Sequence, residues 1–76
     1  MKKLPKEFVA LDLETTGFDP KNAEIIEVGA CVFDHNGIIA SFDTLVKPVG
    51  DIPSQVSSIT GIVDEDVQDA RTFDEI

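Results

Sequence analysis

The sequence contains no tryptophan or tyrosine, and its only cysteine is Cys31. A single cysteine cannot form an internal disulfide, which excludes a disulfide-stapled secreted scaffold and favours a reducing compartment. No apolar run approaches the roughly 20 residues that a membrane-crossing helix requires, and the apolar stretch after the basic start is too short for a signal peptide. These absences predict a cytoplasmic protein without a membrane partner.

Basic residues are also scarce, because six Lys and Arg stand against 15 Asp and Glu and give a formal net charge of −9. Nucleic-acid grooves usually contact phosphates through Lys and Arg, so the charge alone argues against such a groove in this segment. Clustered carboxylates can nevertheless bind an anionic substrate through the divalent cations that they recruit. The acidic tail from Asp64 to Glu75 does not form such a cluster and is interpreted as a solvated helix face.

A length of 76 residues limits the chain to one domain. A domain of about this size buries only roughly 60% of the surface that its unfolded chain exposes, so its stability is marginal. A hydrophobic content of 42% is ordinary for a globular protein and argues against disorder. Residues 1–6 are basic and contain proline, and we expect them to form a mobile lead-in.

Alternating apolar and polar side chains predict three strands, at residues 7–14, 24–34 and 38–47. Asn36-Gly37 lies between the last two strands and predicts a type I′ hairpin turn, which requires positive φ angles. The only histidine, His35, falls in that turn and is expected to face solvent. A sheet that contains a tight hairpin is therefore expected over the first two thirds of the chain.

Short helices are predicted for the last third of the chain. One is expected around residues 55–59 after a cap at Ser54, and a second turn of helix begins at Asp64. Thr72 is the expected N-cap of a third helix that starts at Phe73 and has at most one turn behind it. A packed helix usually has about three turns, so we expect the chain to be a fragment of a larger domain.

The first predicted strand ends in two carboxylates, Asp12 and Glu14. Side chains alternate along a strand, so both point to the same face, with Cα atoms about 6.5–7 Å apart. Two acidic groups on a half-buried strand repel each other and favour a counter-ion, and all-oxygen ligands suit Mg²⁺ or Mn²⁺. The competing interpretation is that the pair forms the solvated face of an edge strand.

The turn that follows the pair, Thr15-Thr16-Gly17, can direct backbone amides toward a phosphate. A calcium-binding EF-hand loop is the competing metal site, because Asp12 and Gly17 fall on its first and sixth positions. Its twelfth position would be Ala23, where a bidentate Glu is needed, and the flanking residues predict a strand instead of a helix. The EF-hand is therefore excluded.

Three blocks in order resemble the DEDD (DnaQ-like) 3′–5′ exonuclease superfamily, and bacterial DNA polymerase III proofreading exonucleases in particular. They are Phe8–Gly17, which is similar to the first exonuclease motif, Glu24–Ala30 and Ile59–Val67. The resemblance implies an α/β, RNase H-like fold, of which this chain forms the N-terminal antiparallel three-stranded meander and the first short helices. Residues 1–76 are then expected to be the N-terminal part of a single exonuclease domain.

The resemblance also implies a two-metal site that hydrolyses phosphodiester bonds. Asp12 and Glu14 are the implied catalytic residues and ligands of Mg²⁺ or Mn²⁺, with Asp12 bridging both ions. The implied substrate-binding residues are Thr15, Thr16, Gly17, Phe18, Ile59 and Thr60. Only the first two of the family's four acids have counterparts in this chain, and His35 is not interpreted as the family's general base.

The implied substrate is the single-stranded 3′ end of DNA, with RNA left open. The implied partners are DNA polymerase subunits, or a polymerase or helicase in the same polypeptide, and the implied role is DNA proofreading or repair. Two alternatives stand beside this function: a non-catalytic acidic module that binds protein, and a truncated product without activity of its own. The aromatic residues Phe8, Phe33 and Phe42 are interpreted as packing residues and not as stacking platforms for bases.

Overall fold

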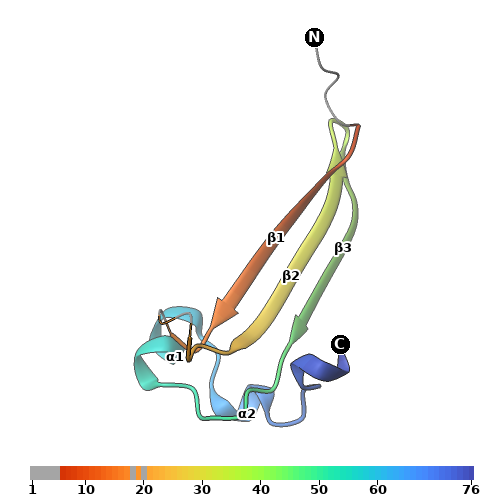
Figure 1. The fold of residues 1–76 in the computed structure, drawn as a ribbon. Helices are drawn as coiled ribbons and strands as arrows, with labels where there is room; N and C mark the ends of the chain where they lie inside the picture. Colours follow the sequence, from red (N-terminus) through yellow and green to blue (C-terminus); the bar gives the residue numbers. More distant parts are fainter. Residues whose placement is uncertain (1–5, 18, 20) are drawn as a thin grey trace.

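The sheet is a three-stranded antiparallel meander. The computed structural model describes residues 6–17, 19 and 21–76, so most of the expected lead-in at residues 1–6 lies outside the described residues. The strands β1 (Phe8–Thr15), β2 (Ile25–Asp34) and β3 (Gly37–Leu45) follow one another in space in the order β1-β2-β3 (Figure 1). The expected meander is confirmed, and each strand lies within one or two residues of its predicted bounds.

The hairpin between β2 and β3 differs from the predicted type I′ turn. Asp34 pairs with Gly37, so His35 and Asn36 form the loop, and neither of these two residues has a positive φ. Positive φ falls on Gly37, at 130°, and the Asp34 side chain accepts a hydrogen bond from the Asn36 N–H at 2.8 Å. The prediction was wrong because this side chain organises the loop, and one extra β3 residue is absorbed after it by a register shift beside Phe33.

The helices are short, as predicted. They are α1 (Ser54–Thr60), α2 (Asp64–Val67) and the 3₁₀ helix η1 (Phe73–Glu75). The predicted cap at Ser54 is wrong, since Ser54 is the first helical residue and Pro53 occupies the N-cap position. Thr72 is the N-cap of η1, as expected, and its N–H and hydroxyl both donate to the Glu75 carboxylate at 2.9 Å.

The acidic tail is more than a solvated helix face, because three of its carboxylates bind backbone amides, two of them in α2 in addition to the Glu75 carboxylate of η1. The Asp64 carboxylate accepts a hydrogen bond from the Ile52 N–H at 2.8 Å, and the Asp66 carboxylate accepts one from the Val63 N–H at 2.9 Å. The first of these bonds ties α2 to the segment that leads into α1. These acids therefore fix the helical connection as well as facing water.

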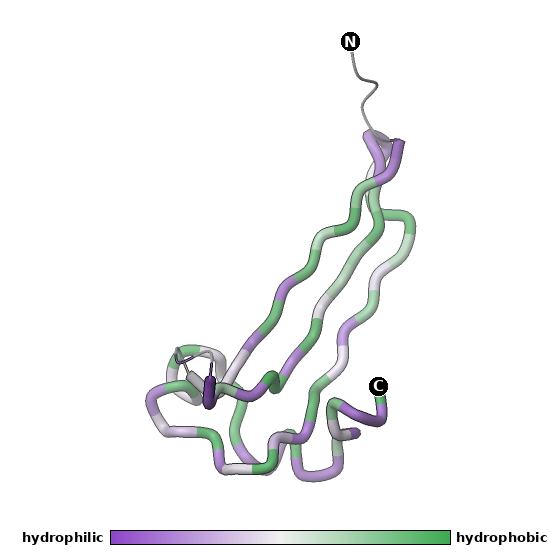
Figure 2. Tube along the Cα trace, viewed as in Figure 1, coloured by the Kyte–Doolittle hydropathy of each residue, from purple (hydrophilic) through white to green (hydrophobic). Residues whose placement is uncertain are grey.

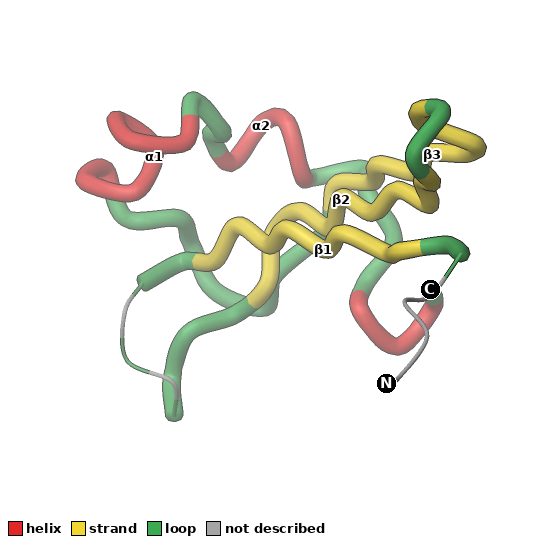
Figure 3. The backbone as a smooth tube through the Cα atoms, turned by 90° about the horizontal axis from the view of Figure 1, so that it is seen from above, coloured by secondary structure: helices red, strands yellow, loops and turns green. Residues whose placement is uncertain are grey.

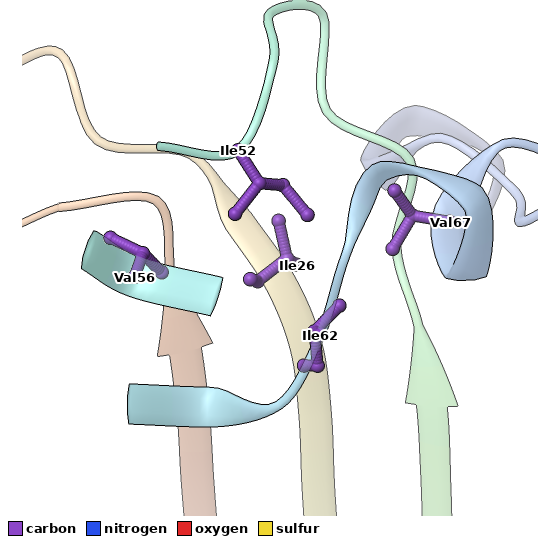
Figure 4. Packing of buried hydrophobic residues seen from close by; sticks show 5 residues of the cluster. All are labelled: Ile26, Ile52, Val56, Ile62 and Val67. Atoms are coloured by element: carbon purple, nitrogen blue, oxygen red, sulfur yellow. The ribbon is translucent and has the colours of Figure 1, made fainter. Parts of the chain in front are cut away.

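The core lies where α1 and α2 pack against the end of the sheet. Five side chains form it, from β2, from both helices and from the segments next to them: Ile26, Ile52, Val56, Ile62 and Val67 (Figure 4). Ile26 is completely buried at its centre. Figure 3 shows α1 and α2 together on one side of the sheet. No helix among the described residues is long and apolar enough to cross a membrane.

The sheet extends well beyond this core. Figure 2 shows hydrophobic residues continuing along the strands toward the hairpin, where no helix covers them. Val9, Leu11 and Ile38 are 70%, 65% and 71% exposed. The radius of gyration is 15.3 Å, whereas a compact domain of this length has about 11 Å. Phe8 and Phe33 stack across the strands with ring centroids 5.5 Å apart, which agrees with their expected packing role.

Candidate metal and substrate site

Strand β1 places the two predicted catalytic carboxylates on one face of the sheet. Asp12 lies opposite Gly29 of β2, and Glu14 lies opposite Glu27. Cross-strand partners point to the same face, so Glu27 joins the predicted pair. Asp12 is exposed and Glu14 is half-buried, since Glu14 is nearer to the helices. The strand alternation that the sequence predicted is therefore present.

A second pair of acidic side chains extends this patch. Gly29 lies between Asp12 and Asp43 of β3, which pairs with it from the other side. Hydrogen bonding with the Asp43 carboxyl raises the pKa of Glu27, and burial and the negative charges of Asp43, Glu14 and Asp12 raise it further. Four carboxyl groups thus share one sheet face and repel one another. That repulsion favours a bound cation.

Gly29 leaves space between the acids of β1 and β3. A hollow of about 400 Å³ lies here, lined by Ala10, Leu11, Asp12, Gly29, Ala30, Cys31, Ser41, Phe42 and Asp43. A Cβ on Gly29 would stand 3.7 Å from the Asp43 Oδ2 atom and 3.9 Å from the Asp12 carbonyl oxygen. A side chain at this position would therefore fill part of the hollow, whereas the glycine keeps it open beside the carboxylate of Asp12.

The donor atoms fit a hard divalent cation. Asp12 and Glu14 offer only carboxylate oxygens, which are the ligands that Mg²⁺ and Mn²⁺ prefer. Within residues 6–17, 19 and 21–76, however, no three His, Cys, Asp or Glu side chains are grouped so as to hold a metal ion together. The two carboxylates thus have the chemistry that a hard cation requires, but the described residues do not form a complete coordination shell.

The turn after β1 is tied down by hydrogen bonds. The Thr15 hydroxyl donates to the Gly17 carbonyl at 2.8 Å. The Thr16 N–H donates to the Glu24 carbonyl at 2.8 Å, and the Glu24 N–H donates to the Thr16 hydroxyl oxygen at 2.9 Å. The hydroxyl of Thr16 is therefore engaged within the protein. Phe18, the fourth predicted residue of this turn, lies outside the described residues.

The end of α1 brings Ile59 and Thr60 toward the same turn. Gly61 ends the helix in the left-handed conformation, with a φ of 78°. The Thr60 hydroxyl donates to the Val56 carbonyl at 2.9 Å and accepts a hydrogen bond from the Ile62 N–H at 3.1 Å. Ile59 is 74% exposed. The helix end is thus fixed by Thr60 and Gly61, while Ile59 is free to contact another molecule.

A cavity of about 200 Å³, here called the β1–α1 cavity, joins these parts. Its strand wall is formed by Leu13, Glu14, Thr15 and Gly17, and its helix wall by Val56, Ile59 and Thr60. Five of the predicted site residues line it, and Asp12 lies in the neighbouring hollow around Gly29. Thr16 lies outside both and faces Glu24. Residues more than 40 positions apart in the chain therefore meet in one place.

Sequence reasoning missed four neighbours of the site. Leu13 and Val56 line the cavity, and Glu27 and Asp43 extend the acidic patch. Glu27 had a usable signal, since it lies on the polar face of an alternating strand. The others depend on which strands and helices pack together, which local patterns do not specify. His35 is exposed in the hairpin, as expected, and Cys31 is half-buried and free.

An antiparallel meander whose first strand presents paired carboxylates beside a short helix is the arrangement expected at the start of an RNase H-like nuclease domain. The model of the RNase_T family, described as an exonuclease, matches residues 9–76. The chain therefore belongs to this exonuclease family.

Curated relatives of the chain include proteins that are named as bacterial DNA polymerase III. The chain is 46% identical over 69 residues to the DNA polymerase III subunit epsilon of Treponema pallidum, covering 91% of this chain and 32% of that protein. It is 44% identical over 69 residues to a PolC-type DNA polymerase III of Thermotoga petrophila, covering 91% of this chain and 5% of that protein. The chain thus spans about a third, or far less, of the length of these relatives.

Solved structures agree on the fold. The nuclease domain of 3′hExo, a DEDDh family member that was solved bound to rAMP, superposes with a TM-score of 0.79 at 26% identity. The match covers 92% of this chain and 39% of that one. The RNase H-like fold that the sequence predicted is confirmed, and the described strands and helices are its N-terminal elements.

Proposed function

We propose that this chain is the N-terminal part of a 3′–5′ exonuclease domain that removes nucleotides from the 3′ end of DNA in proofreading or repair. The observation that carries the proposal is the β1–α1 cavity, in which Glu14 and Thr15 of β1 lie beside Ile59 and Thr60 of α1. Family membership supports the same activity. The cavity supplies a place for a terminal nucleotide next to the acidic end of β1.

In this proposal Asp12 and Glu14 are the catalytic metal ligands. DEDDh exonucleases generally use divalent metal ions, and the oxygen donors here suit Mg²⁺ or Mn²⁺, with two ions in the complete site. Such ions, when bound, stabilise the charge that develops on the phosphate oxygens. Asp12, which lies between the hollow around Gly29 and Glu14, is proposed as the residue that would hold both ions.

The remaining predicted residues receive the substrate. Thr15 and Gly17 shape the strand wall, and Ile59 and Thr60 shape the helix wall of the cavity. Ile59, which is exposed and apolar, contacts the base or sugar of the terminal nucleotide. Thr16 acts through its hydrogen bonds with Glu24, which hold the turn. Phe18 is proposed to approach the same nucleotide from the turn.

The proposed substrate is a single-stranded 3′ end of DNA, with RNA as the alternative. The relatives that are named as DNA polymerase III components support DNA, and a solved 3′-exonuclease named for recognition of a histone mRNA stem-loop, 27% identical, keeps RNA open. The proposed partners are DNA polymerase subunits, or a polymerase or helicase in the same polypeptide. The proposed localisation is the cytoplasm, which the relatives named as bacterial DNA polymerase III proteins support.

A second candidate function is a non-catalytic module that binds protein. The observation that favours it is the uncovered sheet surface, where Val9, Leu11 and Phe42 are 70%, 65% and 49% exposed. Exposed apolar patches commonly mark interaction sites. The strongly negative charge of the chain is compatible with this role, because it disfavours direct contact with phosphates.

Metal binding separates the two functions. ¹⁵N-labelled chain is titrated with Mn²⁺, and paramagnetic broadening is expected to centre on the amides of Asp12, Glu14 and Glu27. Asp12→Asn is expected to weaken Mn²⁺ binding at least about tenfold, because it removes one of two charged ligands. Asp69→Asn, the same charge change at an exposed residue of the tail, is expected to leave the affinity unchanged. Broadening centred on the acidic tail would contradict the proposed site.

Activity is expected to require more than this chain. The chain has counterparts to only two of the family's four acids, so we expect it to release no nucleotides from single-stranded DNA with Mg²⁺ or Mn²⁺. Nucleotide release by the purified chain that disappears in Asp12→Ala would show that the described carboxylates suffice. Release that survives this substitution would place the activity elsewhere.

A further inference from the structure

Glu24, immediately before β2, joins two segments that lie far apart in the sequence. Its Oε1 atom accepts a hydrogen bond from the Val49 N–H at 2.7 Å, and its Oε2 atom accepts one from the Gly50 N–H at 3.0 Å. Both carboxylate oxygens are thus used on two successive backbone amides. Charge-assisted hydrogen bonds of this kind are stronger than those between neutral groups. The carboxylate of Glu24 is therefore a clamp on the segment after β3.

The main chain of Glu24 is bound equally firmly to the turn after β1. Its carbonyl accepts a hydrogen bond from the Thr16 N–H, and its N–H donates to the Thr16 hydroxyl oxygen, at 2.8 and 2.9 Å. Thr16 stands between Thr15 and Gly17, which belong to the strand wall of the β1–α1 cavity. One residue therefore holds the strand wall through its backbone and the Val49–Gly50 segment through its side chain.

The clamped segment leads directly into the helix wall. Four residues after Gly50, α1 begins at Ser54 and carries Val56, Ile59 and Thr60 to the cavity. The side chain of Val49 is 99% exposed, so packing does not hold the start of this segment, whereas Ile52 near its end packs in the core. Hydrogen bonds to Glu24 fix its start, while the bond from the Ile52 N–H to Asp64 fixes its end.

We propose that Glu24 is a positioning residue for the terminal nucleotide, which sets the separation of the two walls of the β1–α1 cavity without touching the substrate. The inference rests on the proposed function of that cavity. It goes beyond that function by assigning a role to a side chain that binds the amides of Val49 and Gly50 and is not among the predicted metal ligands. Glu24 acts on nucleotide binding through Thr16 on one side and through Val49 and Gly50 on the other.

The direction in which nucleotide affinity changes when Glu24 is removed distinguishes a positioning role from a purely electrostatic one. Glu24 carries a negative charge near the proposed site for an anionic nucleotide, and Asp19 and Asp51 line the same hollow as Glu24. Removing the Glu24 charge would by itself reduce repulsion and tighten nucleotide binding. If Glu24 positions the walls, removing it weakens binding instead. The two explanations therefore predict changes in opposite directions.

The test measures binding of thymidine 5′-monophosphate to the 76-residue chain in the presence of Mn²⁺. Glu24→Ala is expected to weaken nucleotide binding about fivefold or more and to leave Mn²⁺ binding at Asp12 unchanged. Glu24→Gln keeps one acceptor oxygen and is expected to weaken nucleotide binding by less than half as much as Glu24→Ala does. Glu7→Ala removes a charge at the far end of the sheet and is the matched control. Unchanged or tighter nucleotide binding in Glu24→Ala would overturn the proposal.

A second measurement, made without nucleotide, keeps this result separate from the proposed function. The methyl NMR signals of Leu13 and Ile59 report on the two walls, and those of Ile26 and Val67 report on the core. In Glu24→Ala the wall signals are expected to shift and the core signals to stay. If wild-type chain binds no nucleotide, the proposed function fails, and the methyl signals alone decide the role of Glu24. The positioning role of Glu24 is overturned if the methyl signals of the walls do not shift, or if those of the core shift by the same amount.

If Glu24→Ala does not fold, the methyl comparison is made with Glu24→Gln. This variant replaces one of the two carboxylate oxygens by an NH₂ group, which cannot accept a hydrogen bond from a backbone N–H. One of the two bonds to Val49 and Gly50 is therefore lost. Smaller shifts of the same wall signals, with an unshifted core, support the proposal. Identical wall signals in wild type and Glu24→Gln at equal stability overturn it.

Discussion

The two ends of the sheet have the same kind of sequence and opposite surroundings. At the helical end, the five side chains of the core are between 0% and 8% exposed. Toward the hairpin, Val9, Leu11 and Ile38 on the same sheet are 65% to 71% exposed. All three strands carry apolar residues along their full length (Figure 2). The difference therefore comes from where α1 and α2 lie, and not from the strands themselves.

This contrast shows that an apolar strand becomes a core only where another layer covers it. The candidate site lies at the boundary between the two ends. Asp12 is exposed on the uncovered part of β1, while Glu14 and Thr15 are half-buried next to α1. The helical end thus fixes the β1–α1 cavity, whereas the acidic patch extends onto a surface with little support from packing.

The largest effect is expected from removing the centre of the core. Ile26→Ala deletes a completely buried side chain and should lower the free energy of unfolding by about 3 kcal/mol, through lost burial and the cavity left behind. For a chain of this size that is enough to abolish a cooperative transition. Urea unfolding followed by circular dichroism measures the change.

The control for this prediction is Leu11→Ala at the uncovered end. Leu11 is 65% exposed, so the same kind of truncation should cost less than about 1 kcal/mol. Equal losses in the two variants would show that the uncovered end is packed in solution, for instance against another copy of the chain. Sedimentation of the wild-type chain would then identify that contact.

An intermediate loss of stability is expected from breaking the hydrogen bond that joins α2 to the segment before α1. Asp64→Ala leaves the part-buried Ile52 N–H without its acceptor and should lower the free energy of unfolding by about 1–2 kcal/mol. Glu65→Ala is a close control, because Glu65 is also an acid in the first turn of α2 and is exposed. A loss of equal size in both variants would assign the effect to the helix dipole instead of the hydrogen bond.

Most of the fold could be predicted from the sequence because it follows local patterns. Period-two alternation located the three strands, and Asn36-Gly37 located the hairpin. The type of that turn could not be predicted, since it depends on the Asp34 side chain bonding to the Asn36 N–H. The cap at Ser54 failed for a similar reason, because Pro53 fits the N-cap position and shifts the helix start by one residue.

Local sequence patterns could predict the candidate site only where its residues are close in sequence. Strand alternation put Asp12 and Glu14 on one face, and the family resemblance implied their role and added Ile59 and Thr60. The clamp of Glu24 on Val49 and Gly50 spans 25 and 26 residues, and neither of its partners contributes a side-chain signal. Contacts of this kind depend on how the segments pack, which the local composition does not encode.

The smallest effects on stability are expected from substitutions of two glutamates, Glu24 and Glu27, whose pKa values are shifted in opposite directions. The amides of Val49 and Gly50 lower the pKa of Glu24 below its ordinary value of 4.5, whereas hydrogen bonding with Asp43, burial and neighbouring acids raise that of Glu27. Glu24 therefore contributes stability that is present above pH 4.5 and is lost as the pH falls through its lowered pKa. Glu27 contributes stability at low pH that is lost as the pH rises through its raised pKa.

In metal-free buffer at pH 7, Glu24→Gln should thus lower the melting temperature and Glu27→Gln should raise it. Each change should correspond to about 0.5 kcal/mol, or about 3 °C, because solvent screens groups this close to the surface. Below the lowered pKa of Glu24 both variants should approach wild type, since the native carboxyls are then protonated. Thermal melts at several pH values measure this. Two variants that shift in the same direction at pH 7 would mean that net charge, and not these local contacts, governs the stability of the sheet end.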